Sequence, residues 1–150
     1  MTRKESNVHE LLVVQVMRTA ELLRMKIGAL LKEYELTPAQ YNIMRILRGA
    51  KMAISLGEVK ERMHVDTSDV SRLIDRLVKK ELVARNICPE NRRKLDVCIS
   101  ESGLGTLKEL DKKISDTLDG FYADVISPEK AKEMTEMLSW IGMKKEVIIC

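Results

Sequence analysis

The chain has 150 residues, of which 33% are charged, and its formal net charge is +3. That length suffices for one domain with its own hydrophobic core, and the charged residues do not form the long blocks that are typical of a disordered chain. Aromatic residues make up only 3%, so a core must be built from Leu, Ile, Val and the nine Met.

The first predicted element is a long helix over residues 7–34, where apolar side chains recur at helical spacing. Such a helix would be roughly 40 Å long, more than one small lobe needs. Basic residues precede the apolar run, as in a signal peptide, but Glu10 interrupts it and no small-residue cleavage site follows. We therefore expect neither a signal peptide nor a membrane span, and a cytoplasmic location.

Two capping signals predict where the next helices begin. In "TPAQ", residues 37–40, the threonine is expected at the N-cap and the glutamine as its capping-box partner, with Pro38 at the first helical position. This helix is expected to end at Gly49. "SLGE", residues 55–58, has the same spacing and opens a short helix to about residue 63, after a short β segment.

"VDTSDVSRLIDRLVKKELV" predicts a fourth helix, capped by Asp66 and ending at Lys80. Its apolar residues at i, i+3, i+4, i+7 and i+8 cover one half: Val70, Leu73, Ile74, Leu77 and Val78. The other half presents hydroxyl and charged side chains: Ser68, Ser71, Arg72, Asp75, Arg76 and Lys79. With the short helix before it, this pattern predicts a helix-turn-helix from Ser55 to Lys80.

Such a helix suits the major groove of DNA, because serine hydroxyls allow close approach and arginine offers a fork for guanine O6 and N7. The same pattern also fits an ordinary surface helix with an ion pair such as Asp75 to Lys79. The helix alone leaves both interpretations open.

"CPENRRKLDVCIS" predicts the tip and return strand of a β-hairpin, with strands over about 82–88 and 94–100. In that register Cys98 pairs near Ala84, so its sulfur lies too far from Cys88 for a disulfide. The odd count of three cysteines without a CxxC spacing also excludes a disulfide framework. A hairpin that carries cations at its tip, directly after a recognition helix, is the wing of a winged helix, and the tip can reach the minor groove.

Charge is unevenly distributed along the chain. Residues 1–100 carry 19 cationic and 13 anionic side chains, whereas residues 101–150 carry 7 and 10. A local basic surface beside an acidic tail fits a nucleic-acid binder, although uneven solvated helix faces fit the charge alone equally well.

Two helices complete the chain. Ser100 is expected to cap a helix that runs to about Val125, and "SPEK", from Ser127, opens a last helix to about Lys145. The fold class is therefore mainly α with a small β-hairpin wing.

Three segments, "LTPAQYNIMRIL", "VDTSDVSRLIDRLVKKELVAR" and "PENRRKLDVCISESG", resemble signatures of the MarR family of bacterial transcriptional regulators. The resemblance covers nearly the whole chain as a single MarR-type unit. It implies a homodimer built from helices over residues 7–36 and 101–150, and a winged helix-turn-helix lobe over residues 37–100. It also implies double-stranded DNA as the partner, a pseudo-palindromic operator, and a small effector ligand that tunes the distance between the two lobes.

The resemblance also implies which residues contact DNA. Arg93 aligns with the family's minor-groove arginine, within Asn91-Arg92-Arg93, and Ser68, Ser71 and Arg72 fall on recognition-helix contact positions. The candidate DNA-binding set is Thr67, Ser68, Ser71, Arg72, Arg76, Arg92, Arg93 and Lys94.

Asp69 stands where the family commonly has a small hydroxyl or apolar residue. Three roles are open to its carboxylate: a favourable charge at the positive helix N-terminus, an ion pair with Arg72 or Arg76, and acceptance of a hydrogen bond from cytosine N4. The sequence favours the first.

Other classes of function fit less well. The chain has two histidines, His9 and His64, neither in a metal-ligand spacing nor beside a nucleophile, and no glycine-rich phosphate loop. We therefore expect no catalytic, cofactor or metal site, and no ligand pocket is assigned. Two alternatives remain. One is a winged-helix module that docks proteins, although such a module would more often have an apolar tip than a cationic one. The other is a regulator that senses oxidation through Cys88, Cys98 or Cys150.

Overall fold

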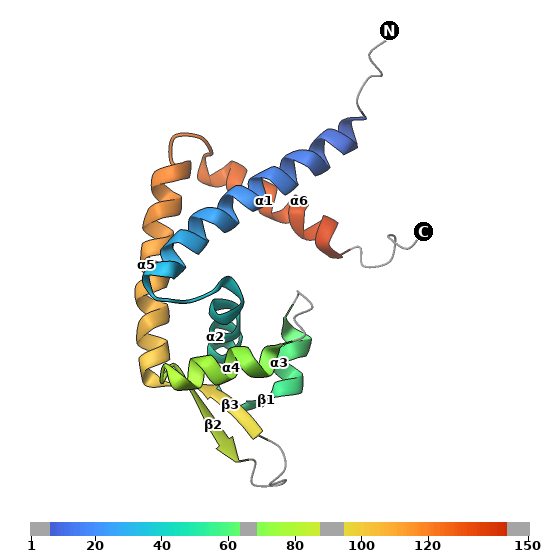
Figure 1. The fold of residues 1–150 in the computed structure, drawn as a ribbon. Coiled ribbons are helices and arrows are strands. Elements are labelled where there is room, and N and C mark those ends of the chain that lie inside the picture. Colours follow the sequence, from blue (N-terminus) through green and yellow to red (C-terminus); the bar gives the residue numbers. More distant parts are fainter. Residues whose placement is uncertain (1–6, 64–68, 88–94, 144–150) are drawn as a thin grey trace. The chain divides into compact units, whose positions relative to one another are not determined.

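The computed structural model describes residues 7–63, 69–87 and 95–143. Within these ranges the chain forms the helices and strands labelled in Figure 1: α1 (Val8–Glu33), α2 (Pro38–Ala50), β1 (Ile54–Ser55), α3 (Leu56–Arg62), α4 (Val70–Lys79), β2 (Val83–Ile87), β3 (Leu95–Ile99), α5 (Glu101–Tyr122) and α6 (Pro128–Met143). The chain forms two compact units, residues 1–113 and 114–150, and the boundary between them lies within α5. The mainly helical fold with a small β wing is confirmed.

The core of the first unit is aliphatic, as the composition predicts. Its ten largest fully buried side chains come from α1 to α5 and from β3: Leu31, Ile43, Met44, Leu47, Val59, Ile74, Leu77, Val97, Leu107 and Leu110. The apolar periodicity of α2 and α4 therefore corresponds to the face that each of these helices buries.

Both predicted capping boxes are present. The Thr37 hydroxyl accepts from the Gln40 amide, and the Gln40 side chain accepts from the Thr37 amide, while Ser55 and Glu58 repeat the arrangement at α3. The predicted end of α2 at Gly49 is wrong by one residue. The helix runs to Ala50, and Lys51 takes the left-handed conformation (φ 57°) in which many helices end.

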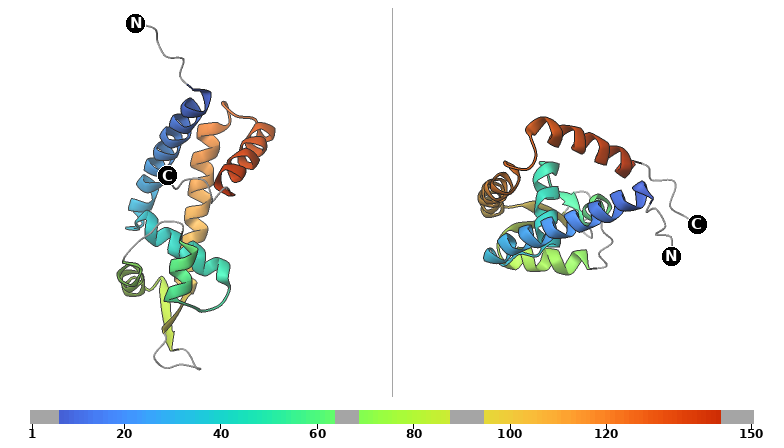
Figure 2. Two further views of the ribbon diagram at one scale, coloured as in Figure 1. Left: turned by 90° about the vertical axis from the view of Figure 1, so that its right-hand side faces the viewer. Right: turned by 90° about the horizontal axis from the view of Figure 1, so that it is seen from above.

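The predicted hairpin is confirmed and gains a third strand. Strand β3 lies between β1 and β2, antiparallel to both, and Ala84 pairs with Cys98 in the predicted register. In Figure 1 and in the left view of Figure 2, β2 and β3 extend together away from helices α2 to α4. The hairpin is thus anchored at its base and projects from the lobe.

The turn between α4 and β2 is packed tightly against the start of α5. Glu81 adopts a left-handed conformation (φ 59°) that glycine enters more easily. The Ser100 hydroxyl donates to the Glu81 carbonyl and accepts from the Gly103 amide, so Ser100 caps α5 as predicted. The Ser100 amide donates to the Leu82 carbonyl at 3.1 Å, which fixes the turn against α5.

The second unit contains the end of α5 and helix α6. Helix α5 ends at Tyr122, slightly before the predicted Val125, and the Ser127 hydroxyl accepts from the Lys130 amide at the start of α6. The predicted end of α6 near Lys145 lies outside the described residues. Within the described part of the chain, none of the helices has the length and hydropathy needed to cross a bilayer.

Candidate nucleic-acid interface

Helix α4 presents a polar face to solvent and an apolar face to the core. Val70, Ile74 and Leu77 are buried, and Leu73 and Val78 are partly buried, so the predicted apolar half is confirmed. The other face exposes side chains of the candidate set and one further cation: Ser71, Arg72, Arg76 and Lys79. Packing thus holds the helix from behind and leaves this face free for a partner.

Asp69 stands at the N-cap position of α4 and pairs with an arginine one turn along. Its side chain makes no capping hydrogen bond, and the Arg72 Nη1 donates to the Asp69 Oδ2 at 3.1 Å. Of the roles considered for Asp69, the structure shows the ion pair with Arg72. The predicted cap, Asp66, lies outside the described residues.

Asp75 pairs across the lobe and not along its own helix. Its carboxylate accepts a hydrogen bond from the Arg85 guanidinium on β2, and no pair with Lys79 forms in the described structure. The ordinary surface-helix interpretation expected that Lys79 pair. Because Arg85 belongs to the hairpin, this contact joins the wing to the middle of α4.

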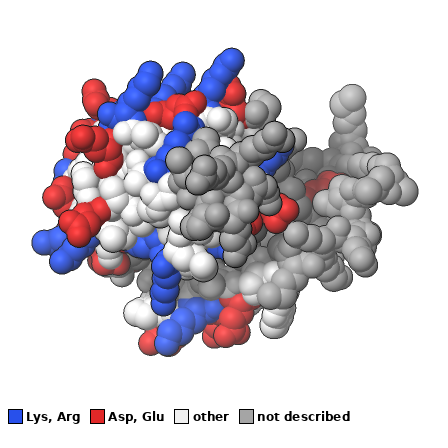
Figure 3. Space-filling model, turned by 90° about the horizontal axis from the view of Figure 1, so that it is seen from below, with Lys and Arg blue, Asp and Glu red and all other residues white. Residues whose placement is uncertain are grey.

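Arg76 and Lys79 keep their charges available. Among the described residues neither forms an ion pair, in contrast to Arg72 and Arg85. Figure 3, viewed from the side toward which the hairpin points, shows Lys and Arg interspersed with carboxylates. The described surface is therefore not a uniformly positive face, and which cations reach DNA depends on the pairing of each one.

The contact between Asp75 and Arg85 should couple the wing to α4. Arg85→Met keeps the apolar stem but removes the guanidinium, and since both side chains are partly exposed we expect a loss of up to about 1 kcal/mol in unfolding free energy. Hydrogen exchange should become faster at the β2 and β3 amides.

A double-mutant cycle tests this coupling. Asp75→Asn should have a similar effect, and the double variant should be no less stable than either single variant. Additive losses of unfolding free energy would contradict the coupling.

Five members of the candidate set lie outside the described residues: Thr67, Ser68, Arg92, Arg93 and Lys94. Their contacts with DNA stay predictions. Among the residues that the structure does describe, no three His, Cys, Asp or Glu side chains are grouped to hold a metal ion.

Comparison with known proteins identifies the family. The MarR family pattern matches residues 36–95. The chain is 25% identical over 111 residues to the HTH-type transcriptional regulator MhqR of Bacillus subtilis, covering 74% of this chain and 75% of MhqR. The structure of AbsC, a MarR family transcriptional regulator from Streptomyces coelicolor, matches with a TM-score of 0.77 and 22% identity, over 94% of this chain and 96% of AbsC. The chain belongs to the MarR family.

It is therefore a DNA-binding transcriptional regulator with a winged helix-turn-helix, and it belongs to a family that is not enzymatic. A second solved structure of the same fold is BpsR of Bordetella bronchiseptica, whose DNA binding is regulated by 6-hydroxynicotinic acid. It matches with a TM-score of 0.70 and 22% identity, over 95% of this chain and 98% of BpsR.

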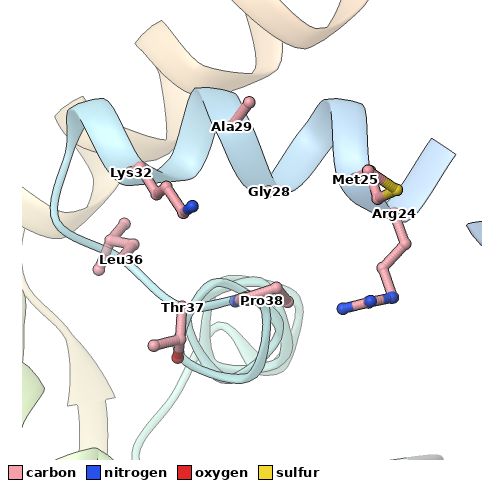
Figure 4. Close-up of a pocket in the computed structure, with 8 residues that line it drawn as sticks. All are labelled: Arg24, Met25, Gly28, Ala29, Lys32, Leu36, Thr37 and Pro38. Carbon is pink, nitrogen blue, oxygen red and sulfur yellow. The ribbon is translucent and has the colours of Figure 1, made fainter. Parts of the chain in front are cut away.

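This MarR-family chain has a surface pocket of about 500 Å³ between α1 and the start of α2. Arg24 and Lys32 lie on α1 on either side of Gly28, and Figure 4 shows both side chains directed toward the N-terminus of α2, with Thr37 and Pro38. Met25, Ala29 and Leu36 complete an apolar lining. The sequence did not predict this pocket. Its lining residues come from two helices, and the packing of two helices against each other cannot be inferred from the spacing of residues within each one.

The first part of α5 is attached to α2 by polar contacts. Asp111 accepts hydrogen bonds from Arg48 and from the Tyr41 hydroxyl, the latter at 3.3 Å. Burial raises the pKa of the Tyr41 phenol above its usual value, and the nearby Asp111 carboxylate adds to the shift. Tyr41 therefore stays protonated at neutral pH and remains a donor.

Proposed function

We propose that this regulator is a cytoplasmic homodimer that binds a pseudo-palindromic operator and represses transcription by occupying it, under the control of a small ligand. Residues 7–36 and 101–150 would form the dimerisation region, and residues 37–100 the DNA-binding lobe. Two recognition helices would then read half-sites about one helical turn apart.

The observation that carries the DNA-binding role is the exposed face of α4. It combines Ser71 and Arg72 with two cations that form no described ion pair, Arg76 and Lys79, on a helix whose other face is anchored in the core. Arg72 would read a base edge in the major groove, whereas Arg76 would neutralise phosphate charge. Thr67, Ser68, Arg92, Arg93 and Lys94 would add contacts from the start of the helix and the wing tip.

The dimer is supported by apolar surface on the terminal helices. Between Val8 and Met17, seven apolar side chains of α1 are exposed: Val8, Leu11, Leu12, Val13, Val14, Val16 and Met17. At 100° per residue they point all around the helix, a pattern typical of a helix that is buried on every side. On α6, four exposed residues at i, i+3, i+4 and i+7 form one apolar stripe: Met134, Met137, Leu138 and Ile141. A second copy of the chain would cover these surfaces.

The ligand would be a small aromatic anion in the pocket between α1 and α2. Its apolar lining suits a ring, and Lys32 supplies positive charge at the rim, whereas the Arg24 guanidinium is already paired with the Glu21 carboxylate. The 6-hydroxynicotinic acid that regulates DNA binding by BpsR has this chemistry. Because the pocket joins a helix of the dimerisation region to the first helix of the DNA-binding lobe, its occupant would act on their relative positions.

Selection of duplexes from a genomic library by the purified full-length chain tests the DNA-binding function. We expect recovery of one pseudo-palindromic sequence with half-sites roughly 10 bp apart, centre to centre. A library without enrichment would overturn sequence-specific binding and favour a protein-docking winged helix.

A further inference from the structure

We propose that Asp69 determines specificity: it holds Arg72 in position for a guanine and, by its charge, weakens binding to DNA in general. The proposal rests on the proposed entry of α4 into the major groove. It predicts that the Asp69 carboxylate lowers the affinity for DNA of any sequence but raises the discrimination between the operator and other sequences. A purely structural role would not produce this combination.

The geometry places the two side chains where they can act together. Asp69 and Arg72 lie one turn apart at the start of α4, and both side chains are well exposed, by 55% and 77%. The described hydrogen bond of the Asp69 side chain goes to the Arg72 Nη1, at 3.1 Å, and not to the helix backbone. The other acid on this helix, Asp75, is engaged with Arg85 on β2. The Asp69 carboxylate is therefore directed at the arginine that would read DNA.

The contact leaves the other edge of the guanidinium available for DNA. Arginine carries five N–H donors in a planar fork. When Nη1 is engaged by the carboxylate, the edge formed by Nε and Nη2 is free to donate two parallel hydrogen bonds to guanine O6 and N7. An exposed arginine otherwise samples many rotamers. Ordering it before binding reduces the entropy that is lost when the guanine contact forms.

The same carboxylate opposes binding to every DNA sequence. Attraction between cationic side chains and phosphates supplies most of the non-specific affinity, and a negative charge at this surface reduces it. Only a site that offers a guanine to Arg72 compensates for the repulsion, so the charge also acts against wrong sequences. An exposed pair of this kind contributes little to folding stability, and its effect belongs to binding.

The test compares the affinities of full-length variants for three kinds of duplex. These are the selected operator, a series of operators that each carry one changed base pair, and a duplex of random sequence. Asp69→Ala should bind the random duplex about 3–10-fold more tightly at low salt. It should also lose about 5–10-fold in discrimination at the base pair where Arg72→Ala loses about tenfold or more. Fluorescence anisotropy titrations supply the dissociation constants, and thermal melting verifies that each variant is folded.

Two further variants separate charge from positioning. Asp69→Asn removes the charge but keeps an acceptor oxygen, so it should gain affinity for the random duplex while retaining most of the discrimination. Glu61→Gln is a charge-matched control on α3, with no ion pair to Glu61 among the described residues. It should leave discrimination at the Arg72 base pair unchanged.

Each remaining outcome decides between the two proposals. If Arg72→Ala alters discrimination at one base pair and Asp69→Ala does not, the role of Asp69 is overturned and the proposed function stands. The role is equally overturned if Asp69→Ala does not tighten binding to the random duplex. If Arg72→Ala alters discrimination at no position, the entry of α4 into the major groove is wrong, and the role of Asp69 fails with it.

Discussion

Gly103→Ala is expected to destabilise the first unit by about 3 kcal/mol, because the added methyl group has no room. A Cβ at this position would lie 2.2 Å from the Leu82 carbonyl oxygen and 2.8 Å from the Ile99 Cγ1. The carbonyl is backbone and accepts a hydrogen bond from the Ser100 amide, so it cannot move without opening the turn between α4 and β2. Urea denaturation measures the change in unfolding free energy.

The matched control is Gly105→Ala, two residues further along α5, where a Cβ would meet nothing within 4 Å. There alanine should stabilise the helix by up to about 1 kcal/mol, since glycine is the poorer helix former. Equal effects of the two substitutions would show that α5 does not pack on the turn as described.

The second large effect is expected from charges placed on the apolar stripe of α6. In the proposed dimer, Met134→Asp combined with Leu138→Asp buries two unpaired carboxylates. We expect the dimer dissociation constant to rise about 100-fold or more. Affinity for the operator should fall with it, because a monomer engages a single half-site. Sedimentation velocity at micromolar concentration measures the first effect, and anisotropy titrations the second.

Lys132→Asp provides the control, because it places a carboxylate on the same helix but on the face opposite the stripe. It should leave the dimer intact. A dimer that persists in the double variant would mean that α6 is not part of the interface.

The sequence predicted those features that depend on residues close together in the chain. The capping boxes at Thr37 and Ser55 and the register that pairs Ala84 with Cys98 all follow from local spacing. The end of α2 was misplaced, because glycine is the usual signal for a left-handed residue and here Lys51 adopts that conformation.

Features that join distant segments were not predictable in this way. Local spacing favoured Lys79 as the partner of Asp75, whereas the fold brings Arg85 from the next strand to it. The pocket between α1 and α2 and the close approach of Gly103 to Leu82 likewise depend on packing between elements. At Asp69 the sequence favoured a helix-dipole role and left the ion pair with Arg72 as an alternative, and the structure shows that pair.

The apolar side chains that surround the first part of α1 also affect the kinetics of assembly. If the proposed dimer forms, a newly made chain exposes the residues from Val8 to Met17 until it meets a second copy, and that encounter is bimolecular and slows as the chain becomes scarcer. During this interval the helix end is a surface on which chains can aggregate. The rate of synthesis would therefore determine how long unpaired chains persist, and a regulator made at low abundance would spend the longest time in that state.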